Sequence, residues 1–267
     1  MPGEFVDKLP EGALLRPDTW PAGCGALMTT RAGGVSVGPH ATLNLKAQPG
    51  EDEDAIAVLQ NRRRLRATVS AAPVWLDQVH GTQVVRLDRS HAARGAAAPR
   101  ADASIATVPG IACTVLVADC LPVLFATRDG LAVGAAHAGW RGLSGGVLEA
   151  ALRALCAASG ARPHDVMAWL GARIGPERFE VGDDVRQAFG REDARAFRFL
   201  PEASAREGRH KWLADLGLIA RTRLQDAGVG HIADCGLCTA SDPARFFSFR
   251  RDGPSGRMAA AAWIDAV

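Results

Sequence analysis

Two histidines and a cysteine are the residues of this chain best suited to chemistry. Each lies where a short apolar segment meets a turn of small residues: His80 ends residues 75–80, Cys120 ends residues 115–120, and His137 precedes the glycine-containing stretch 138–142. Two imidazoles and a thiolate form the ligand set of a catalytic zinc site, which keeps a fourth position open for water or substrate. The same side chains could be a cysteine nucleophile and its histidine base.

The spacing of these three residues does not decide between the alternatives. Long stretches of sequence separate His80, Cys120 and His137, so only the fold can bring them together. A buried histidine at the end of a strand is often a hydrogen-bonded core residue, and a buried cysteine often behaves as a small apolar side chain. A metal site, a nucleophile with its base and a purely structural role therefore all remain open at this point.

Charged residues lie next to two of these positions. Arg141 follows His137 within a turn whose glycine N–H groups can face an anion, although a solvated arginine in an ordinary turn is the simpler interpretation. Asp119 precedes Cys120 and could orient a histidine ligand, act as a base or accept backbone N–H groups. Asp102, between two alanines, has the same possibilities.

Composition limits the class of protein. The chain has 267 residues, of which 48% are hydrophobic and 22% charged, and this balance predicts a globular fold with a sizeable core. A net charge of +2 gives no argument for nucleic acid or a membrane surface as a partner. There is no apolar run long enough for a membrane span and no signal-peptide pattern at the start, so we expect a cytoplasmic protein whose six cysteines are thiols or metal ligands.

The pattern of apolar residues predicts a mixed sheet with helices outside, in one domain. We expect helices over 51–70, 144–158, 181–189 and 212–227, with acidic residues 51–53 at the start of the first. We expect strands on both sides of His80 within 73–87 and at 111–118, 123–126, 131–136, 166–170, 246–249 and 258–264. The run 111–118 is almost wholly apolar, which is typical of a strand buried on both faces.

Other motifs give weaker evidence about function. The Cys-x-x-Cys at 235–238 has no second pair and is followed by loop-forming residues, so two ordinary thiols are favoured over a zinc ribbon or a redox motif. Arg250 and Arg251 could be charges at a strand edge, or one could reach an anionic ligand. Dinucleotide-binding, P-loop, HExxH, nucleophile-elbow and nucleobase-deaminase patterns are absent.

Taken together, these residues resemble one family, known as laccase-domain or multicopper polyphenol oxidase-like proteins and also as purine nucleoside phosphorylases or peptidoglycan editing factors. The matches follow one another in order from about residue 26 to the C-terminus. They comprise residues 28–36, 43–45, 78–81, 118–123, 136–142, 174–176, 179–182, 238–239 and 246–252.

The resemblance implies an α+β fold, an α/β sandwich of mixed β-sheets with outer helices, similar to the cysteine-hydrolase domain of a bacterial toxin. One domain would span residues 1–267, with 1–21 as an N-terminal extension or first strand. His80, Cys120 and His137 would bind Zn²⁺, with copper as the second choice of metal, and would form the active site with Asp119. Residues contacting substrate or phosphate would be Arg31, Asn44, Arg141 and Arg250.

The implied activity is phosphorolysis of adenosine, inosine and 5′-methylthioadenosine, with adenosine deamination as a second reaction, in a monomer or small homo-oligomer. Alternatives are a cysteine-type amide hydrolase that edits peptidoglycan precursors, and a protein that binds nucleosides without turnover. Copper-dependent polyphenol oxidation is disfavoured, because seven histidines without an H-x-H pair cannot supply a multicopper cluster.

Three positions depart from the family pattern. Ala240 and Phe249 stand where tyrosines are common in relatives, so any contact that those hydroxyls make is lost. Arg173 stands where a small residue or cysteine is frequent, and we expect it to change the charge of the pocket.

Overall fold

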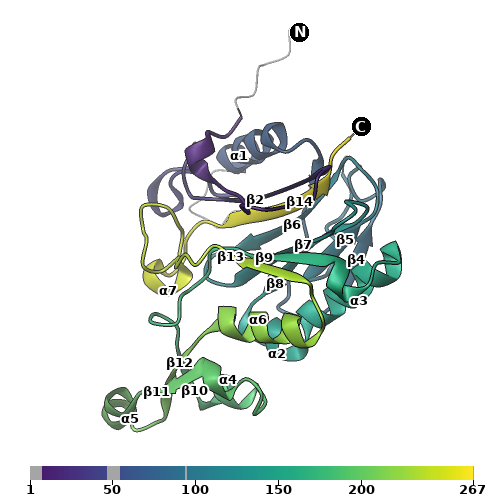
Figure 1. Ribbon diagram of the computed structural model, residues 1–267. Helices are drawn as coiled ribbons and strands as arrows, with labels where there is room; N and C mark the ends of the chain where they lie inside the picture. The colour runs from purple at the N-terminus through teal and green to yellow at the C-terminus, as the bar shows by residue number, and fades with distance from the viewer. Residues whose placement is uncertain (1–7, 47–54, 94, 267) are drawn as a thin grey trace.

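Two stacked β-sheets form the centre of the molecule (Figure 1). The structure is a computed structural model that describes residues 8–46, 55–93 and 95–266. The first sheet has five strands, in the order β1 (Leu14–Leu15), β2 (Cys24–Thr29), β14 (Met258–Ile264), β6 (Ile111–Val117) and β3 (Ala72–Val74). The second has six, in the order β13 (His231–Asp234), β9 (Val166–Leu170), β7 (Leu121–Thr127), β8 (Val133–Ala138), β5 (Ala103–Ala106) and β4 (Val84–Leu87).

Apolar side chains from both sheets fill the space between them. Met28 and Val115 from the five-stranded sheet belong to the same buried cluster as Leu124 and Trp169 from the six-stranded sheet. Neighbouring residues of the same strands point to the opposite faces, which are also covered. The expectation that the apolar run 111–118 is a strand buried on both faces is confirmed by β6.

Helices cover the outer face of each sheet (Figure 1). α1 (Ala55–Thr68) lies over the five-stranded sheet, and α2 (Trp140–Gly145), α3 (Val147–Ser159) and α6 (Leu216–Asp226) lie over the six-stranded sheet. The expected mixed α+β sandwich with outer helices is therefore confirmed. No helix among the described residues is long and apolar enough to cross a membrane.

The helix expected over 144–158 is divided in two. Gly146 separates α2 from α3 with a φ of +93°, a backbone angle that glycine adopts readily because it lacks a Cβ. α3 buries Leu148, Leu152 and Leu155 along one face and ends at Gly160, whose N–H donates to the carbonyl of Cys156.

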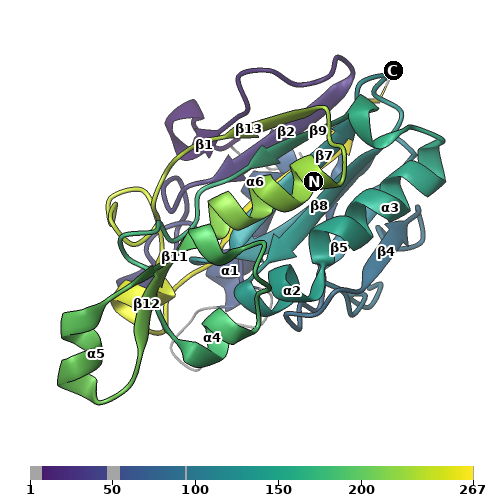
Figure 2. The same ribbon diagram turned by 60° about the horizontal axis from the view of Figure 1, so that its bottom comes forward.

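A small third sheet projects from the sandwich (Figure 2). It contains β10 (Glu180–Gly182), β12 (Lys211–Ala214) and β11 (Phe197–Phe199), with α4 (Asp183–Gln187) and α5 (Pro201–Glu207) beside it. The helices expected over 181–189 and 212–227 were thus too long, because each begins as a strand of this sheet. α6 begins only after Asp215, whose carboxylate accepts the N–H of Leu218.

The strand expected at 246–249 is wrong. Phe246 and Phe247 are buried in a loop, and α7 (Phe249–Asp252) follows because the Ser248 hydroxyl caps it by accepting the N–H of Arg251. Short 3₁₀ turns occur at Glu11–Ala13, Gly38–His40, Pro163–Asp165 and Ala194–Ala196. Of the proposed N-terminal extension, β1 pairs with β2, whereas residues 1–7 and the acidic residues 51–53 lie outside the described residues.

The chain passes twice from the five-stranded to the six-stranded sheet, and both connections carry residues predicted to do chemistry. The strands on either side of His80 are β3 and β4, which belong to different sheets. Cys120 lies in the short turn between β6 and β7. Because β8 runs antiparallel to β7, with His137 opposite Pro122, the last residues of β8 lie beside the start of β7.

Candidate functional site

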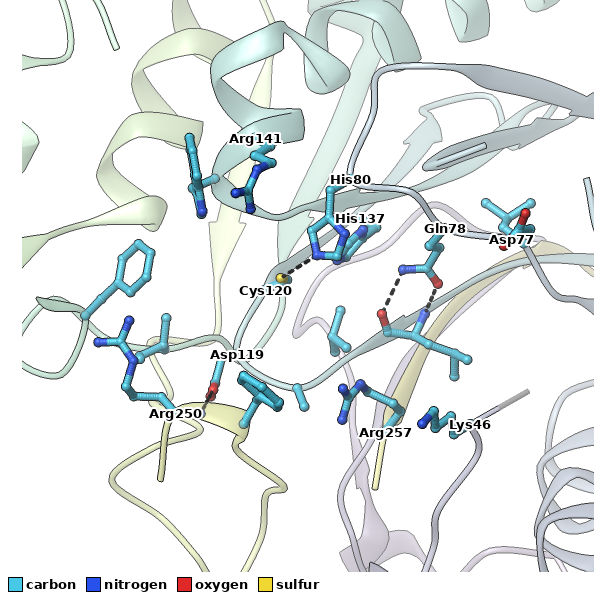
Figure 3. A pocket seen from close by; sticks show the side chains of 18 of the residues that line it. Lys46, Asp77, Gln78, His80, Asp119, Cys120, His137, Arg141, Arg250 and Arg257 are labelled. Carbon is cyan, nitrogen blue, oxygen red and sulfur yellow. Dashed lines mark hydrogen bonds between the residues drawn. The ribbon is translucent and has the colours of Figure 1, made fainter. Parts of the chain in front are cut away.

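His80, Cys120 and His137 converge at these connections (Figure 3). Their ligand atoms all lie within 4.8 Å of one another, and Cys120 Sγ is 3.9 Å from His80 Nε2. The two imidazole rings meet edge to face, with centroids 4.7 Å apart. His137 is buried, Cys120 is half-buried and His80 is exposed, so the group faces solvent from one side.

Asp102 organises this group from behind. Its Oδ1 lies 2.9 Å from His137 Nδ1, and the β5–β8 register explains this contact because Ala103 is paired with Ala136. The same buried carboxylate accepts the backbone N–H groups of Val79, His80 and Gly81 at 3.1, 2.9 and 2.7 Å. The hydrogen bond at Nδ1 leaves His137 Nε2 directed toward the site, which is how a carboxylate orients a metal-binding or basic imidazole.

The backbone around the group is held in unfavourable conformations. His80 has a φ of 60° and Asp119 a φ of 86°, and such angles in non-glycine residues cost on the order of 1–3 kcal/mol and are typical of functional sites. Gly139 provides the remaining space, because a Cβ at this position would lie 2.9 Å from His80 Cδ2 and 3.0 Å from Cys120 Sγ. The glycine is thus required by the packing of the site itself.

Electrostatics favour a charged pair at the centre. Burial alone would raise the pKa of the Cys120 thiol, but the charges and hydrogen bonds of His137 and His80 outweigh it and lower the pKa to about 6. Burial likewise acts to lower the pKa of His137, whereas Cys120 and Asp102 raise it to about 9. Without a metal, Cys120 and His137 therefore form a thiolate–imidazolium pair near neutral pH.

The group opens into a cavity of about 800 Å³. This volume lies in the usual range for small-molecule sites. Its walls combine the aromatic side chains of Trp140, Phe179 and Phe249 with aliphatic ones such as Leu76 and Ile174. Its basic residues are Lys46, Arg141, Arg250 and Arg257.

Two of the four predicted substrate-binding residues line this cavity. Arg141 stacks on Trp140 with 4.3 Å between guanidinium carbon and ring centroid, and Arg250 lies over Phe179 and donates to the carbonyl of Glu180 at 2.9 Å. Arg31 is not among the lining residues; its guanidinium donates to the carbonyls of Ala41 and Pro243.

Asn44 is also absent from the lining and is fully buried. Its Oδ1 accepts the backbone N–H groups of Lys46 and Arg257 at 3.0 and 2.8 Å. Asn44 therefore fixes the backbone of two residues that do line the cavity.

Asp119 borders the cavity, but its hydrogen bonds go to another part of the chain. Its carboxylate accepts the hydroxyls of Thr239 and Ser248 and the backbone N–H of Arg250, at 2.6, 3.0 and 2.7 Å. These contacts fit the expectation that it accepts backbone N–H groups, and they tie the turn at Cys120 to residues 239–250. Asp119 and Asp102 were both expected as possible partners of a histidine. Asp102 is the one that contacts a histidine, His137.

Several residues of the cavity were not among the predicted site residues, and three of them are polar side chains that matter for the site. Gln78 clamps the His80 loop to β6 through paired hydrogen bonds with the backbone N–H and carbonyl of Leu116, at 2.8 and 2.9 Å. Lys46 and Arg257 line the cavity although neither belongs to a motif that predicts chemistry. The only sequence signal for Lys46 was its position just after the family-like segment 43–45.

Arg173 does not charge the pocket as expected. Its guanidinium is buried, makes a bidentate ion pair with Asp234 at 2.8 and 2.9 Å, and is not among the lining residues. Ala240 is buried, and Phe249 contributes an exposed aromatic ring to the cavity. Cys235 and Cys238 are free thiols in a loop, in keeping with the expected ordinary role.

The donor set fits a metal ion. Zinc bonds to imidazole nitrogen at about 2.0–2.1 Å and to thiolate sulfur at about 2.3 Å, so ligand atoms within 4.8 Å of one another can share one ion after small adjustments. This is the one group of three such ligands among residues 8–46, 55–93 and 95–266. Three protein ligands leave a coordination position free, as in catalytic zinc sites.

Similarity to known proteins extends over nearly the whole chain. Residues 25–265 match the family described as multi-copper polyphenol oxidoreductase laccase. A Pseudomonas aeruginosa protein named purine nucleoside phosphorylase is 48% identical over 255 residues, which cover 94% of this chain and 98% of that protein. The Escherichia coli purine nucleoside phosphorylase YfiH is 45% identical, with 91% and 95% covered.

Solved structures share the fold. A Neisseria meningitidis protein superimposes with a TM-score of 0.85 at 42% identity, covering 95% of this chain and all of that one. YlmD from Geobacillus stearothermophilus superimposes with a TM-score of 0.86 at 32% identity, covering 98% and 99%.

Proposed function

This chain belongs to the multi-copper polyphenol oxidoreductase laccase family, and from its relatives and its site we propose that it is a metal-dependent purine nucleoside phosphorylase. The observation that carries the proposal is the convergence of His80, Cys120 and His137 at one cavity that also presents aromatic and basic side chains. We propose adenosine, inosine and 5′-methylthioadenosine as substrates, with adenosine deamination as a second reaction.

Zinc is the metal that we propose, since two imidazoles and one thiolate are borderline-soft donors, and copper is the second choice. Held by His80, Cys120 and His137, the ion would supply a Lewis acid at the reacting centre. Asp102 keeps the His137 ring oriented, and Gly139 leaves room for the ligand atoms. The six cysteines are free thiols, which supports the cytoplasmic location that we propose.

Phosphorolysis makes clear demands on the cavity. A phosphate oxygen forms a bond to the ribose C1′ while the bond from C1′ to the purine breaks, and the purine leaves with the electron pair and takes up a proton. Positive side chains favour this step because they hold the attacking anion in place. Trp140, Phe179 and Phe249 offer apolar surface on which a purine can stack.

The test uses purified protein with its metal content measured. Inosine, adenosine and methylthioadenosine are incubated with and without phosphate, and the products are separated by chromatography. We expect phosphate-dependent release of the purine base and loss of turnover in the Cys120→Ala variant. Full turnover by Cys120→Ala would show that the site has another purpose.

A cysteine hydrolase is a second candidate, favoured by the lowered pKa of Cys120 beside the His137–Asp102 pair. Cys120 would attack an amide of a peptidoglycan precursor, with His137 supplying the proton to the leaving amine. Amide hydrolysis by metal-free protein would support this function, whereas activity that requires stoichiometric zinc would exclude it. Polyphenol oxidation remains disfavoured, because only two of the seven histidines belong to the site.

A further inference from the structure

None of the four basic residues of the cavity makes an ion pair within the described part of the chain, and two of the four, Lys46 and Arg257, lie together. Both line the cavity, and neither makes an ion pair with any carboxylate among residues 8–46, 55–93 and 95–266. By contrast, Arg173 is neutralised by Asp234, and Arg223 by Asp193. A partly buried cation without a counter-charge is unfavourable unless a ligand supplies one.

Asn44 holds these two residues together. Its Oδ1 accepts the backbone N–H of both, and the N–H of Leu45 donates to the carbonyl of Arg257 at 3.0 Å. The Arg257 Nη1 group donates to the carbonyls of Ser255 and Gly256, at 2.8 and 3.1 Å. The guanidinium is thus anchored at one nitrogen, and its other N–H groups are available to a ligand.

This pair lies within the electrostatic reach of the centre. Burial lowers the pKa of the Arg257 guanidinium, and the anionic groups that act against this are those of Cys120 and Asp119. Figure 3 shows Lys46 and Arg257 on the same side of the cavity, apart from Arg141 and Arg250. An anion bound between them would sit in the same cavity as His80 and His137.

We propose that Lys46 and Arg257 form the subsite for the inorganic phosphate that attacks the nucleoside. This assignment rests on the proposed phosphorylase function and places the phosphate on residues other than Arg141 and Arg250. Lys46 and Arg257 are preferred because Asn44 holds their backbones together, whereas Arg141 lies on the Trp140 ring and Arg250 at the carbonyl of Glu180. Two cations match a dianion, and a guanidinium and an ammonium donate charge-assisted hydrogen bonds to it.

The experiment compares Lys46→Gln, Arg257→Gln and Arg257→Lys with a matched control, Arg153→Gln, which removes a charge from the exposed side of α3. Phosphate binding is measured by calorimetry, and the KM for phosphate is measured at saturating inosine. We expect Lys46→Gln and Arg257→Gln to weaken phosphate binding and to raise the KM for phosphate, each about tenfold or more. Arg257→Lys should be intermediate, and Arg153→Gln should match the wild type. The KM for inosine should change much less.

The outcomes separate the subsite from the function. Lys46→Gln is the safer variant, because the Lys46 ammonium makes no hydrogen bond in the described structure. Normal phosphate binding and a normal KM for phosphate in this variant would overturn the subsite, even if Arg257→Gln failed to fold. That result would leave the proposed phosphorolysis standing. Phosphate binding that depends on both cations in a protein that does not cleave nucleosides would refute the function but not the anion site. Loss of affinity for inosine 5′-monophosphate alone, with free phosphate unaffected, would overturn our assignment to the co-substrate.

Discussion

The most demanding test of the site is the substitution Asp102→Asn. The Asp102 carboxylate is fully buried and accepts four hydrogen bonds, three from the backbone of the His80 loop and one from the His137 ring. An asparagine has the same shape but no charge, and its amide nitrogen must face at least one of these donors. The change therefore weakens both the loop and the imidazole contact.

The expected magnitude follows from these contacts. A hydrogen bond to a charged group contributes about 1.5–3 kcal/mol and a neutral one about 0.5–1.5 kcal/mol, so four weakened bonds amount to roughly 3–5 kcal/mol of unfolding free energy. Removing one partner of a buried ion pair has a similar effect of about 3–5 kcal/mol. If the asparagine amide donates to His137 Nδ1, the proton moves to Nε2, and that nitrogen can no longer bind a metal.

The assay is zinc binding in competition with a chromophoric chelator, together with denaturant unfolding of the metal-free protein. We expect zinc affinity to fall on the order of 10- to 100-fold, as for other carboxylates that orient a histidine ligand. Asp119→Asn is the matched control, since this carboxylate is also buried and accepts three hydrogen bonds, but none from a histidine. Wild-type zinc affinity in Asp102→Asn, or an equal loss in Asp119→Asn, would refute the reasoning.

The pH dependence has a definite sign. Burial acts to raise the pKa of Asp102, but His137 and the loop N–H groups outweigh it, so the pKa lies below its usual value. The stabilisation is therefore present above about pH 4, where an unfolded aspartate is ionised, and is lost as the pH falls through the lower folded pKa. The Asp102→Asn variant should lack this contribution, so denaturant unfolding at a series of acidic pH values should show a smaller loss of stability on acidification than in the wild type.

Three further perturbations test other parts of the structure. Gly139→Ala should lower turnover about tenfold or more, because the new Cβ must displace His80 or Cys120, whereas Gly12→Ala, with nothing within 4 Å, should be neutral by the same kinetic assay. In metal-free protein, alkylation of Cys120 by iodoacetamide should rise with pH around a midpoint near pH 6, the pKa of about 6 that His137 and His80 give this thiol. Mass spectrometry near pH 7 should find Cys24 and Cys113 unmodified, because their pKa values are raised to about 11 and 12. A Cys120 profile centred near pH 9 would contradict the paired thiolate. Arg173→Met should reduce unfolding free energy by about 3 kcal/mol, since Asp234 loses its bidentate partner, yet leave the KM values of the folded protein unchanged; a large rise in KM would place Arg173 in the binding cavity after all.

Residue type and local pattern were enough to select His80, Cys120 and His137 as candidates, although they left a metal site, a nucleophile and a structural role open. His80, Cys120 and His137 combine the donors that metals and nucleophilic sites require with positions at the ends of apolar segments, and the buried strands around them follow from their apolar runs. The chemistry of an individual side chain is a local property. It can therefore be recognised in the sequence without knowing which helices and strands become neighbours.

The roles of the acidic and basic residues could not be predicted in this way. Asp102 and Asp119 looked equivalent, and the choice between them depends on the β5–β8 register, which places Asp102 opposite His137. Lys46 and Arg257 come from distant parts of the chain and are brought together by hydrogen bonds of Asn44 and Leu45. The strands β10 and β12 replaced the first turns of two expected helices, because pairing between these two segments, which are distant in the sequence, outweighed local helical periodicity.

The two passages of the chain between the sheets have a consequence for the folding of the protein. His80 and Cys120 occupy these passages and His137 the adjoining strand, so the three donors come together only after both sheets have formed and stacked. An ion bound by all three would recognise the folded chain and not the unfolded one, and would shift the folding equilibrium by about 4 kcal/mol when its concentration is a thousand times its Kd. The supply of metal would then set how much folded protein a cell maintains, as well as how active that protein is.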